Sequence, residues 1–129
     1  MRLNRILACS AVVVAAAVMI VPAAGSAGDP EAGQKVFRKC ATCHEVKEPK
    51  NKVGPHLVGI FGRPAGTVEG FKYSEAMKNT GITWDEETLG AYVKNPKTYV
   101  EGNRMIFAGL KKDEEVADLI AYLQAATAQ

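Results

Sequence analysis

The chain has 129 residues, of which 23% are charged and 47% hydrophobic, and its formal net charge is +2. This length is enough for one small domain and excludes a second one. A net charge so close to zero says nothing about binding partners. Only the distribution of charge along the chain is informative.

Residues 1–27 are predicted to be an export signal peptide. Two arginines precede a mostly apolar run over 6–21, Pro22 ends that run, and residues 25–27 are small, as at a cleavage site. Cleavage there would leave a domain of residues 28–129 with 14 basic and 14 acidic side chains. The alternative is an uncleaved membrane anchor, because the run approaches the roughly 20 apolar residues that span a bilayer.

The first predicted helix begins at residues 29–31 and runs to about Cys40. Its aspartate can cap the N-terminus and its proline suits the first helical position. Gly33, Val36, Phe37 and Cys40 recur at helical spacing and form one apolar stripe. A glycine inside a helix costs about 1 kcal/mol relative to alanine, so Gly33 predicts a close crossing with another helix.

Cys40-Ala41-Thr42-Cys43-His44 follows this helix. A C-x-x-C-H run is typical of covalent haem c attachment, with both thiols reaching one porphyrin edge and the adjacent imidazole ligating the iron. A zinc site would need a second pair of ligands, and only His56 remains after His44. A thioredoxin-type motif would need a βαβ pattern, which is not visible. Residues 28–129 hold no further cysteine, so no structural disulfide is available.

Five glycines and two prolines over residues 53–70 exclude a long helix or a regular strand there. A loop this long is unusual in a small domain unless something inside organises it. A haem, as a large flat apolar core, can serve that purpose.

Three helices are predicted after this loop. Ser74 can cap a short one that ends near residue 79, and Thr83 and Glu86 form a capping box for a second that stops before Pro96. Asp113 can cap the last helix. Its apolar residues recur at helical spacing: Val116, Leu119, Ile120 and Leu123. The sequence therefore predicts a single all-α domain with long loops.

The candidates for a second iron ligand are Met77, Met105 and His56. A short amphipathic helix explains Met77 by core packing, and His56 lies in a loop close to His44. We favour Met105, because residues 95–109 show no helical period and a bond to iron would tether them. Met/His ligation raises the reduction potential and closes both axial positions. Such an iron suits an electron carrier rather than an enzyme.

Taken together, these motifs resemble a class I cytochrome c of the mitochondrial and bacterial c2 type, over essentially all of residues 29–129. The resemblance rests on Val36-Phe37-x-x-Cys40-x-x-Cys43-His44, Val53-Gly54-Pro55-His56-Leu57, Phe61-Gly62-Arg63, Gly81-Ile82-Thr83-Trp84, Tyr92-Val93-x-Asn95-Pro96 and Met105-Ile106-Phe107-Ala108-Gly109. It implies a fold in which the N- and C-terminal helices cross, with Gly33 and Phe37 against Leu119 and Tyr122, and long loops wrapped around one haem.

The same resemblance implies roles for individual residues. Pro55 would offer its carbonyl to His44, and Tyr92 and Asn103 would border Met105. Three side chains would hydrogen-bond the haem propionates: Arg63, Tyr73 and Trp84. Six basic residues would form a docking ring around the exposed haem edge: Lys35, Lys39, Lys52, Lys97, Arg104 and Lys111.

The function implied is a soluble one-electron shuttle between a bc1-type reductase and a terminal oxidase or photosynthetic reaction centre. We expect a periplasmic monomer that docks transiently and binds no nucleic acid. One alternative is a haem peroxidase or ligand-binding sensor with a labile sixth ligand, which only Glu101, just before Gly102, favours. Another is a membrane-anchored carrier, which differs only in residues 1–27.

Overall fold

The structure, a computed structural model, describes residues 28–128, so the predicted signal peptide lies outside the described residues. Five helices follow one another along the chain: α1 (Pro30–Phe37), α2 (Glu75–Lys78), α3 (Glu86–Lys94), α4 (Pro96–Tyr99) and α5 (Asp113–Thr127). Within the described range there is no strand, and Pro64 and Thr83 form one isolated antiparallel bridge. The all-α prediction is confirmed.

Helix α1 begins as the sequence predicts and ends earlier. The Asp29 carboxylate accepts a hydrogen bond from the Glu31 N–H at 2.8 Å, with Pro30 at the first position. The helix stops at Phe37 rather than near Cys40, because the backbone bonds tighten there. Arg38 and Lys39 donate to carbonyls only three residues back, at 3.3 and 3.1 Å. Such bonds wind the chain into tighter turns than an α-helix.

Two predicted caps are wrong. Helix α3 is capped by Asp85, whose carboxylate accepts from the Thr88 N–H at 2.8 Å while Thr88 Oγ1 accepts from the Asp85 N–H at 2.9 Å. Thr83 lies two residues before this cap, and its carbonyl accepts a hydrogen bond from Thr88 Oγ1 at 3.1 Å. Asp113 is the first residue of α5 rather than its cap, and its carboxylate accepts from Lys94 Nζ at 2.5 Å.

The one-turn helix α4 was not predicted. Its signal was Pro96, since proline is preferred at the first helical position, but four residues are too few to show a period. Helix α2 is confirmed, with Ser74 Oγ accepting from the Met77 N–H at 3.1 Å.

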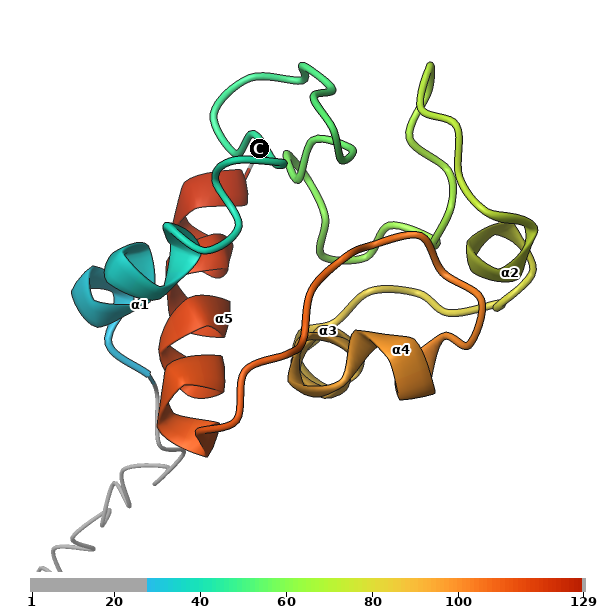
Figure 1. The fold of residues 1–129 in the computed structure, drawn as a ribbon. Coiled ribbons are helices and arrows are strands. Elements are labelled where there is room, and N and C mark those ends of the chain that lie inside the picture. The colour runs from blue at the N-terminus through green and yellow to red at the C-terminus, as the bar shows by residue number, and fades with distance from the viewer. Residues whose placement is uncertain (1–27, 129) are drawn as a thin grey trace, which may run out of the picture.

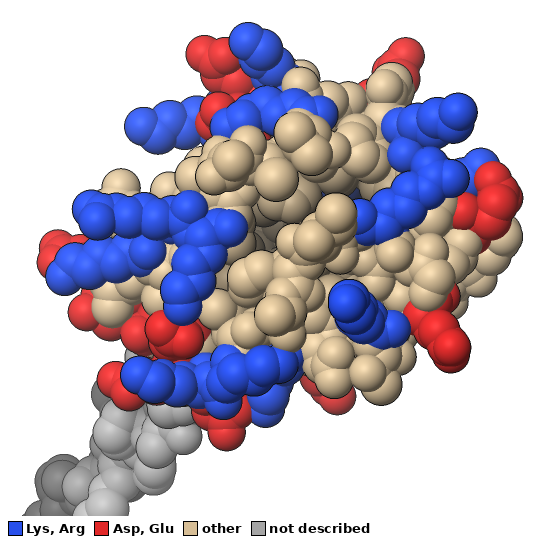
Figure 2. Space-filling view, in the orientation of Figure 1, with Lys and Arg blue, Asp and Glu red and all other residues tan. Residues whose placement is uncertain are grey.

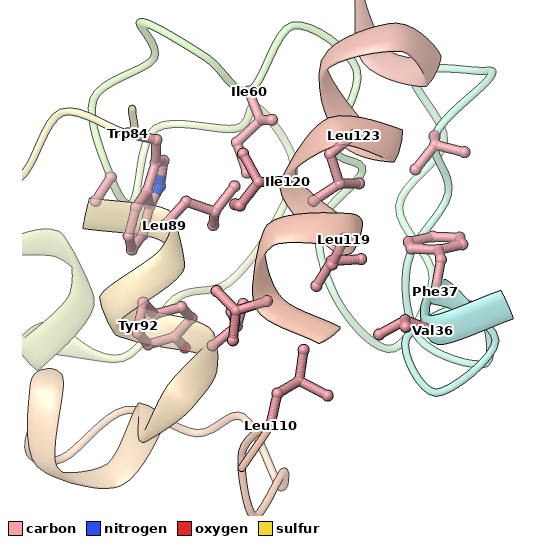
Figure 3. Close-up of a cluster of buried hydrophobic side chains, with 14 of the residues drawn as sticks. Val36, Phe37, Ile60, Trp84, Leu89, Tyr92, Leu110, Leu119, Ile120 and Leu123 are labelled. Atoms are coloured by element: carbon pink, nitrogen blue, oxygen red, sulfur yellow. The ribbon is translucent and has the colours of Figure 1, made fainter. Parts of the chain in front are cut away.

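The helical frame is built on α5, which α1 crosses at one end of the molecule (Figure 1). A Cβ added at Gly33 would lie 1.9 Å from the Asp118 carbonyl oxygen, so the predicted close crossing is confirmed. The Phe37 and Tyr122 rings lie 5.3 Å apart across it. Figure 3 shows Leu119 and Leu123 on the side of α5 that faces α1, and Ile120 on the side that faces α3. Leu119 and Leu123 are 1% and 2% exposed.

We predict that Gly33→Ala destabilises the protein. The added methyl meets backbone that cannot move independently, and overpacking of this kind costs about 2 kcal/mol or more, which lowers Tm by about 4–8 °C per kcal/mol in a domain of this size. Thermal melting followed by circular dichroism measures it.

Gly90→Ala in α3 is the matched control. Its Cβ would lie 3.5 Å from Val116 Cγ1, an ordinary contact, and alanine gains up to about 1 kcal/mol in helix propensity. Equal melting temperatures for the two variants would contradict the close crossing.

Candidate functional site

The Cys40–His44 segment forms one tight turn directly after α1. The Cys43 and His44 N–H groups both donate to the Cys40 carbonyl, at 3.0 and 2.9 Å. Both cysteines are half-buried and neither forms a disulfide. Burial raises the pKa of the Cys40 thiol to about 11, whereas redox-active cysteines have a lowered pKa. The described residues also contain no group of three or more His, Cys, Asp or Glu side chains that could hold a metal ion.

The His44 ring is fixed by a backbone carbonyl. Its Nδ1 lies 2.7 Å from the Pro55 oxygen. A carbonyl can only accept, so Nδ1 carries the proton and Nε2 keeps its lone pair for a metal. Burial lowers the pKa of His44, which favours the same neutral form.

Gly54 makes this arrangement possible. A Cβ at this position would lie 2.5 Å from His44 Cε1, so any other residue would push the ring away. The Gly54 N–H also donates to the Cys43 carbonyl at 2.8 Å, which ties the loop to the cysteine turn. We did not predict this role for Gly54, although the Gly54-Pro55 pair signalled a defined turn.

Met105 lies partly buried in the segment between α4 and α5. The Tyr92 hydroxyl donates to Met105 Sδ at 3.8 Å, and the Met105 N–H donates to Asn103 Oδ1 at 2.8 Å. The Asn103 amide in turn donates to the carbonyls of Pro96 and Val100, at 2.7 and 2.8 Å. The structure therefore brings Met105, Tyr92 and Asn103 together and ties them to the end of α4.

A second anchor lies on the other side of Met105. Gly109 has φ +98°, and a Cβ there would lie 2.1 Å from the Lys94 carbonyl oxygen. The next residue, Leu110, is 1% exposed and donates its N–H to the Val93 carbonyl at 2.8 Å. The Met105 segment is thus fixed to the C-terminal end of α3.

Met77, the rival methionine, lies in α2 and is 8% exposed as part of the hydrophobic core. The rival histidine, His56, has a buried ring Nδ1 with no partner among the described residues. Its backbone N–H donates to Asn51 Oδ1 at 3.1 Å. Asn51 also donates to the Glu69 carbonyl at 3.0 Å. Asn51 therefore joins two parts of the glycine-rich loop, a role that we did not predict.

Three hydrogen-bond donors lie on half-buried or buried side chains: Arg63 and Tyr73 are half-buried, and Trp84 is buried. The Arg63 guanidinium donates to the Val58 and His56 carbonyls, both at 3.1 Å, and burial lowers its pKa. The Tyr73 oxygen accepts from a backbone N–H, so its own proton remains free to donate, and burial raises its pKa. Trp84 is 6% exposed, and no described residue accepts a hydrogen bond from its indole N–H. These unused donors suit carboxylates such as haem propionates.

All six basic residues of the predicted docking ring are exposed. Three of them contact the chain: Lys39 pairs with Glu115 at 3.0 Å, Lys52 donates to the Ala41 carbonyl at 2.6 Å, and Lys111 donates to the Ala108 carbonyl at 2.7 Å. Figure 2 shows Lys and Arg side chains spread around a hollow lined by other residue types, with most Asp and Glu toward the margins of the view.

The chain that carries this cysteine–histidine turn and the hydrogen-bonded Met105 loop has clear counterparts among known proteins. The family model described as cytochrome c matches residues 30–127. The chain belongs to the cytochrome c family. It is 50% identical over 109 residues to cytochrome c2 of Blastochloris viridis, covering 84% of each chain. It is 57% identical over 104 residues to cytochrome c of Chlamydomonas reinhardtii, covering 79% of this chain and 93% of that protein.

The fold has a solved counterpart as well. Cytochrome cH from Methylobacterium extorquens superposes with a TM-score of 0.72 and 41% identity, covering 76% of this chain and 99% of that one. The predicted class I cytochrome c fold is therefore confirmed. The chain is an electron carrier of the cytochrome c family rather than an enzyme, and its cofactor is covalently attached haem c.

The described residues fit this cofactor. Cys40 and Cys43 lie one helical turn apart with free thiols, Gly54 leaves room beside the His44 ring, and the donor set of Arg63, Tyr73 and Trp84 suits carboxylates. None of the helices within residues 28–128 is both long and apolar enough to cross a membrane.

We predict that Gly109→Ala destabilises this cytochrome far more than Gly70→Ala. Both glycines have positive φ, +98° and +72°, so both variants pay the strain of a left-handed conformation, about 1–2 kcal/mol. Only at position 109 does the new methyl also collide with backbone, since the nearest atom at position 70 is 3.8 Å away. Guanidinium unfolding should show an additional loss of about 2 kcal/mol at position 109. Equal losses would mean that the Gly109 contact does not hold the segment.

Proposed function

We propose that His44 and Met105 are the two axial ligands of a haem bound through Cys40 and Cys43. The observation that carries this proposal is that both ligands are held by independent hydrogen bonds. The Pro55 carbonyl orients His44 at 2.7 Å, and Tyr92 and Asn103 hold the sulfur and backbone of Met105. When bound, the iron supplies a one-electron couple between Fe(II) and Fe(III).

Two ligands held in place by the protein, as proposed for His44 and Met105, suit electron transfer. Because neither side chain depends on the iron alone for its position, both can keep their places when the charge of the iron changes. The Tyr92 hydrogen bond withdraws electron density from the Met105 sulfur, and a thioether favours the electron-rich ferrous state. An iron bound by both His44 and Met105 would have no open position for peroxide, which argues against the peroxidase and sensor alternatives.

Arg63, Tyr73 and Trp84 are proposed to bind the propionates. The Arg63 guanidinium uses two donors on backbone carbonyls and retains others, so it can fix the loop and neutralise a carboxylate together. Burial of a carboxylate without such donors would cost several kcal/mol.

The redox partners are proposed to dock at the six basic side chains. Their charge would guide the cytochrome onto acidic patches of a bc1-type reductase and of a terminal oxidase or reaction centre, through small and transient contacts. Lys35, Lys97 and Arg104 make no ion pair or hydrogen bond through their side chains among the described residues, so these three can turn toward a partner without breaking an existing bond.

We further propose that residues 1–27 direct export and are removed, which places the mature carrier in the periplasm as part of a respiratory or photosynthetic chain. The two arginines, the apolar run and the small residues at 25–27 support export. Mass spectrometry of the native protein tests this directly: the expected N-terminus is Gly28, and an N-terminus at Met1 would support a membrane-anchored carrier instead.

The ligand assignment predicts opposite results for the two methionines. Met105→Ala should abolish the absorption band that reports an Fe–S(Met) bond and allow the ferrous protein to bind carbon monoxide. Met77→Ala should keep the band, although loss of a buried methionine costs about 2–5 kcal/mol of stability. If Met105→Ala kept the band, or the unmodified ferrous protein bound carbon monoxide at neutral pH, Met105 would not be the ligand.

The docking ring predicts a charge-specific loss of rate. Lys97→Glu should slow electron transfer to membranes that contain cytochrome oxidase by about tenfold at low ionic strength, with the difference fading as the Debye length falls below about 10 Å. Lys78→Glu is the control, because Lys78 lies outside the ring and pairs with Glu75 of its own helix at 2.5 Å. Equal effects of both substitutions, or rates that do not depend on salt, would contradict docking at the ring.

A further inference from the structure

Two tyrosine rings lead from the Met105 sulfur to the protein surface. The Tyr92 hydroxyl contacts Met105 Sδ at 3.8 Å. The centroid of the Tyr92 ring lies 6.3 Å from that of Tyr99, with the planes tilted by 60°. Tyr92 is 7% exposed and Tyr99, at the end of α4, is 38% exposed. Aromatic rings thus form a short series that begins at the proposed sixth ligand and ends in water.

We propose that Tyr99 and Tyr92 form a second electron path, through which the reduced cytochrome repairs one-electron oxidation of Tyr99 at the surface. This path rests on the proposed ligation by Met105 and does not use the exposed haem edge. Its oxidant is a solvent-borne one-electron oxidant, such as a peroxyl radical or a photogenerated metal complex.

The reaction has two balanced steps. The oxidant takes one electron from Tyr99, and the Tyr99 phenol releases its proton to water, leaving a neutral phenoxyl radical. Tyr99 then regains one electron across Tyr92 and Met105 and one proton from water. The O–H bond of Tyr99 is thereby restored, and the iron is oxidised from Fe(II) to Fe(III).

Tyr92 and Tyr99 have different surroundings and therefore different roles in the electron path. Oxidation of a phenol is favourable when its proton can leave at the same time, and half-exposed Tyr99 can pass its proton to water. Tyr92 is buried, and its hydroxyl donates to a thioether sulfur, which cannot take the proton. Tyr92 therefore serves as a bridge across which the electron passes, and the neutral phenoxyl radical forms at Tyr99.

Tyr122 provides an internal reference. It lies in α5 at the crossing with α1, and its ring neighbour among the described residues is Phe37, at 5.3 Å. Unlike Tyr92, Phe37 has no hydroxyl group that could contact Met105, so Tyr122 has no corresponding path to the proposed ligand. Tyr122 should therefore report the general exposure of the protein to oxidant, including any oxidant that the haem edge consumes.

The test compares the two oxidation states of the complete haem-loaded protein. Photogenerated ruthenium(III) tris-bipyridine is applied at low dose to the ferrous and to the ferric form, and oxidation of Tyr99 and Tyr122 is measured by mass spectrometry of peptides. We expect the ratio of Tyr99 to Tyr122 oxidation to be several-fold lower in the ferrous protein. Equal ratios in the two forms would overturn the path.

A variant then tests the bridge. Tyr92→Leu removes the ring and should make the ratio the same in both forms; a ratio that still depends on the oxidation state overturns the role of Tyr92. The Fe–S(Met) band, which belongs to the ferric state, is recorded for every protein in its ferric form. Equal ratios with the band present reject the path alone, whereas an absent band in the unmodified protein rejects the proposed ligation.

A kinetic measurement covers the case in which Tyr92→Leu does not fold. After a laser flash, oxidation of the iron in Tyr99→Phe should lose the component that passes through Tyr99, whereas Tyr122→Phe should match the unmodified protein. The same kinetics in Tyr99→Phe and the unmodified protein would overturn the proposal.

Discussion

The hydrogen bond between His44 Nδ1 and the Pro55 carbonyl is the contact on which the site depends. It fixes the tautomer of the imidazole and so decides which nitrogen can face a metal. Its geometry requires that Gly54 have no side chain. The loop that supplies the carbonyl is held in turn by Asn51 and by the Arg63 guanidinium. These hydrogen bonds give a glycine-rich segment without regular structure a fixed conformation.

The Met105 segment is likewise held by hydrogen bonds and by a glycine that allows a close backbone contact. Asn103 and Gly109 fix the Met105 segment to α4 and α3. Helix α4 packs on α3, and α3 is held against α5 by apolar side chains such as Ile120. The helical frame thus anchors the Met105 segment, while short polar contacts set the orientation of each proposed ligand. This division suits a protein that must keep one geometry in two oxidation states.

Charge and aromatic rings give the surface two distinct features. The basic side chains surround the hollow and suit transient docking to acidic partners. The contact between Tyr92 and Tyr99 instead reaches the surface at α4. The same helix carries Lys97 of the docking ring, so the proposed repair path and the proposed docking surface meet at α4.

The sequence by itself determined the cofactor, the family and the helical class, because these depend on local spacing: two cysteines and a histidine within one turn, and apolar residues at helical intervals. It also indicated the tight crossing at Gly33. Only the tertiary structure decided the cap of α3, the early end of α1 and the roles of Gly54, Asn51 and Gly109. The cap of α3 and the end of α1 were each decided by one of several competing local hydrogen bonds. The roles of Gly54, Asn51 and Gly109 depend on neighbours distant in sequence, such as His44 beside Gly54 or Lys94 beside Gly109. Local propensity carries no information about such contacts, which exist only once the chain has folded.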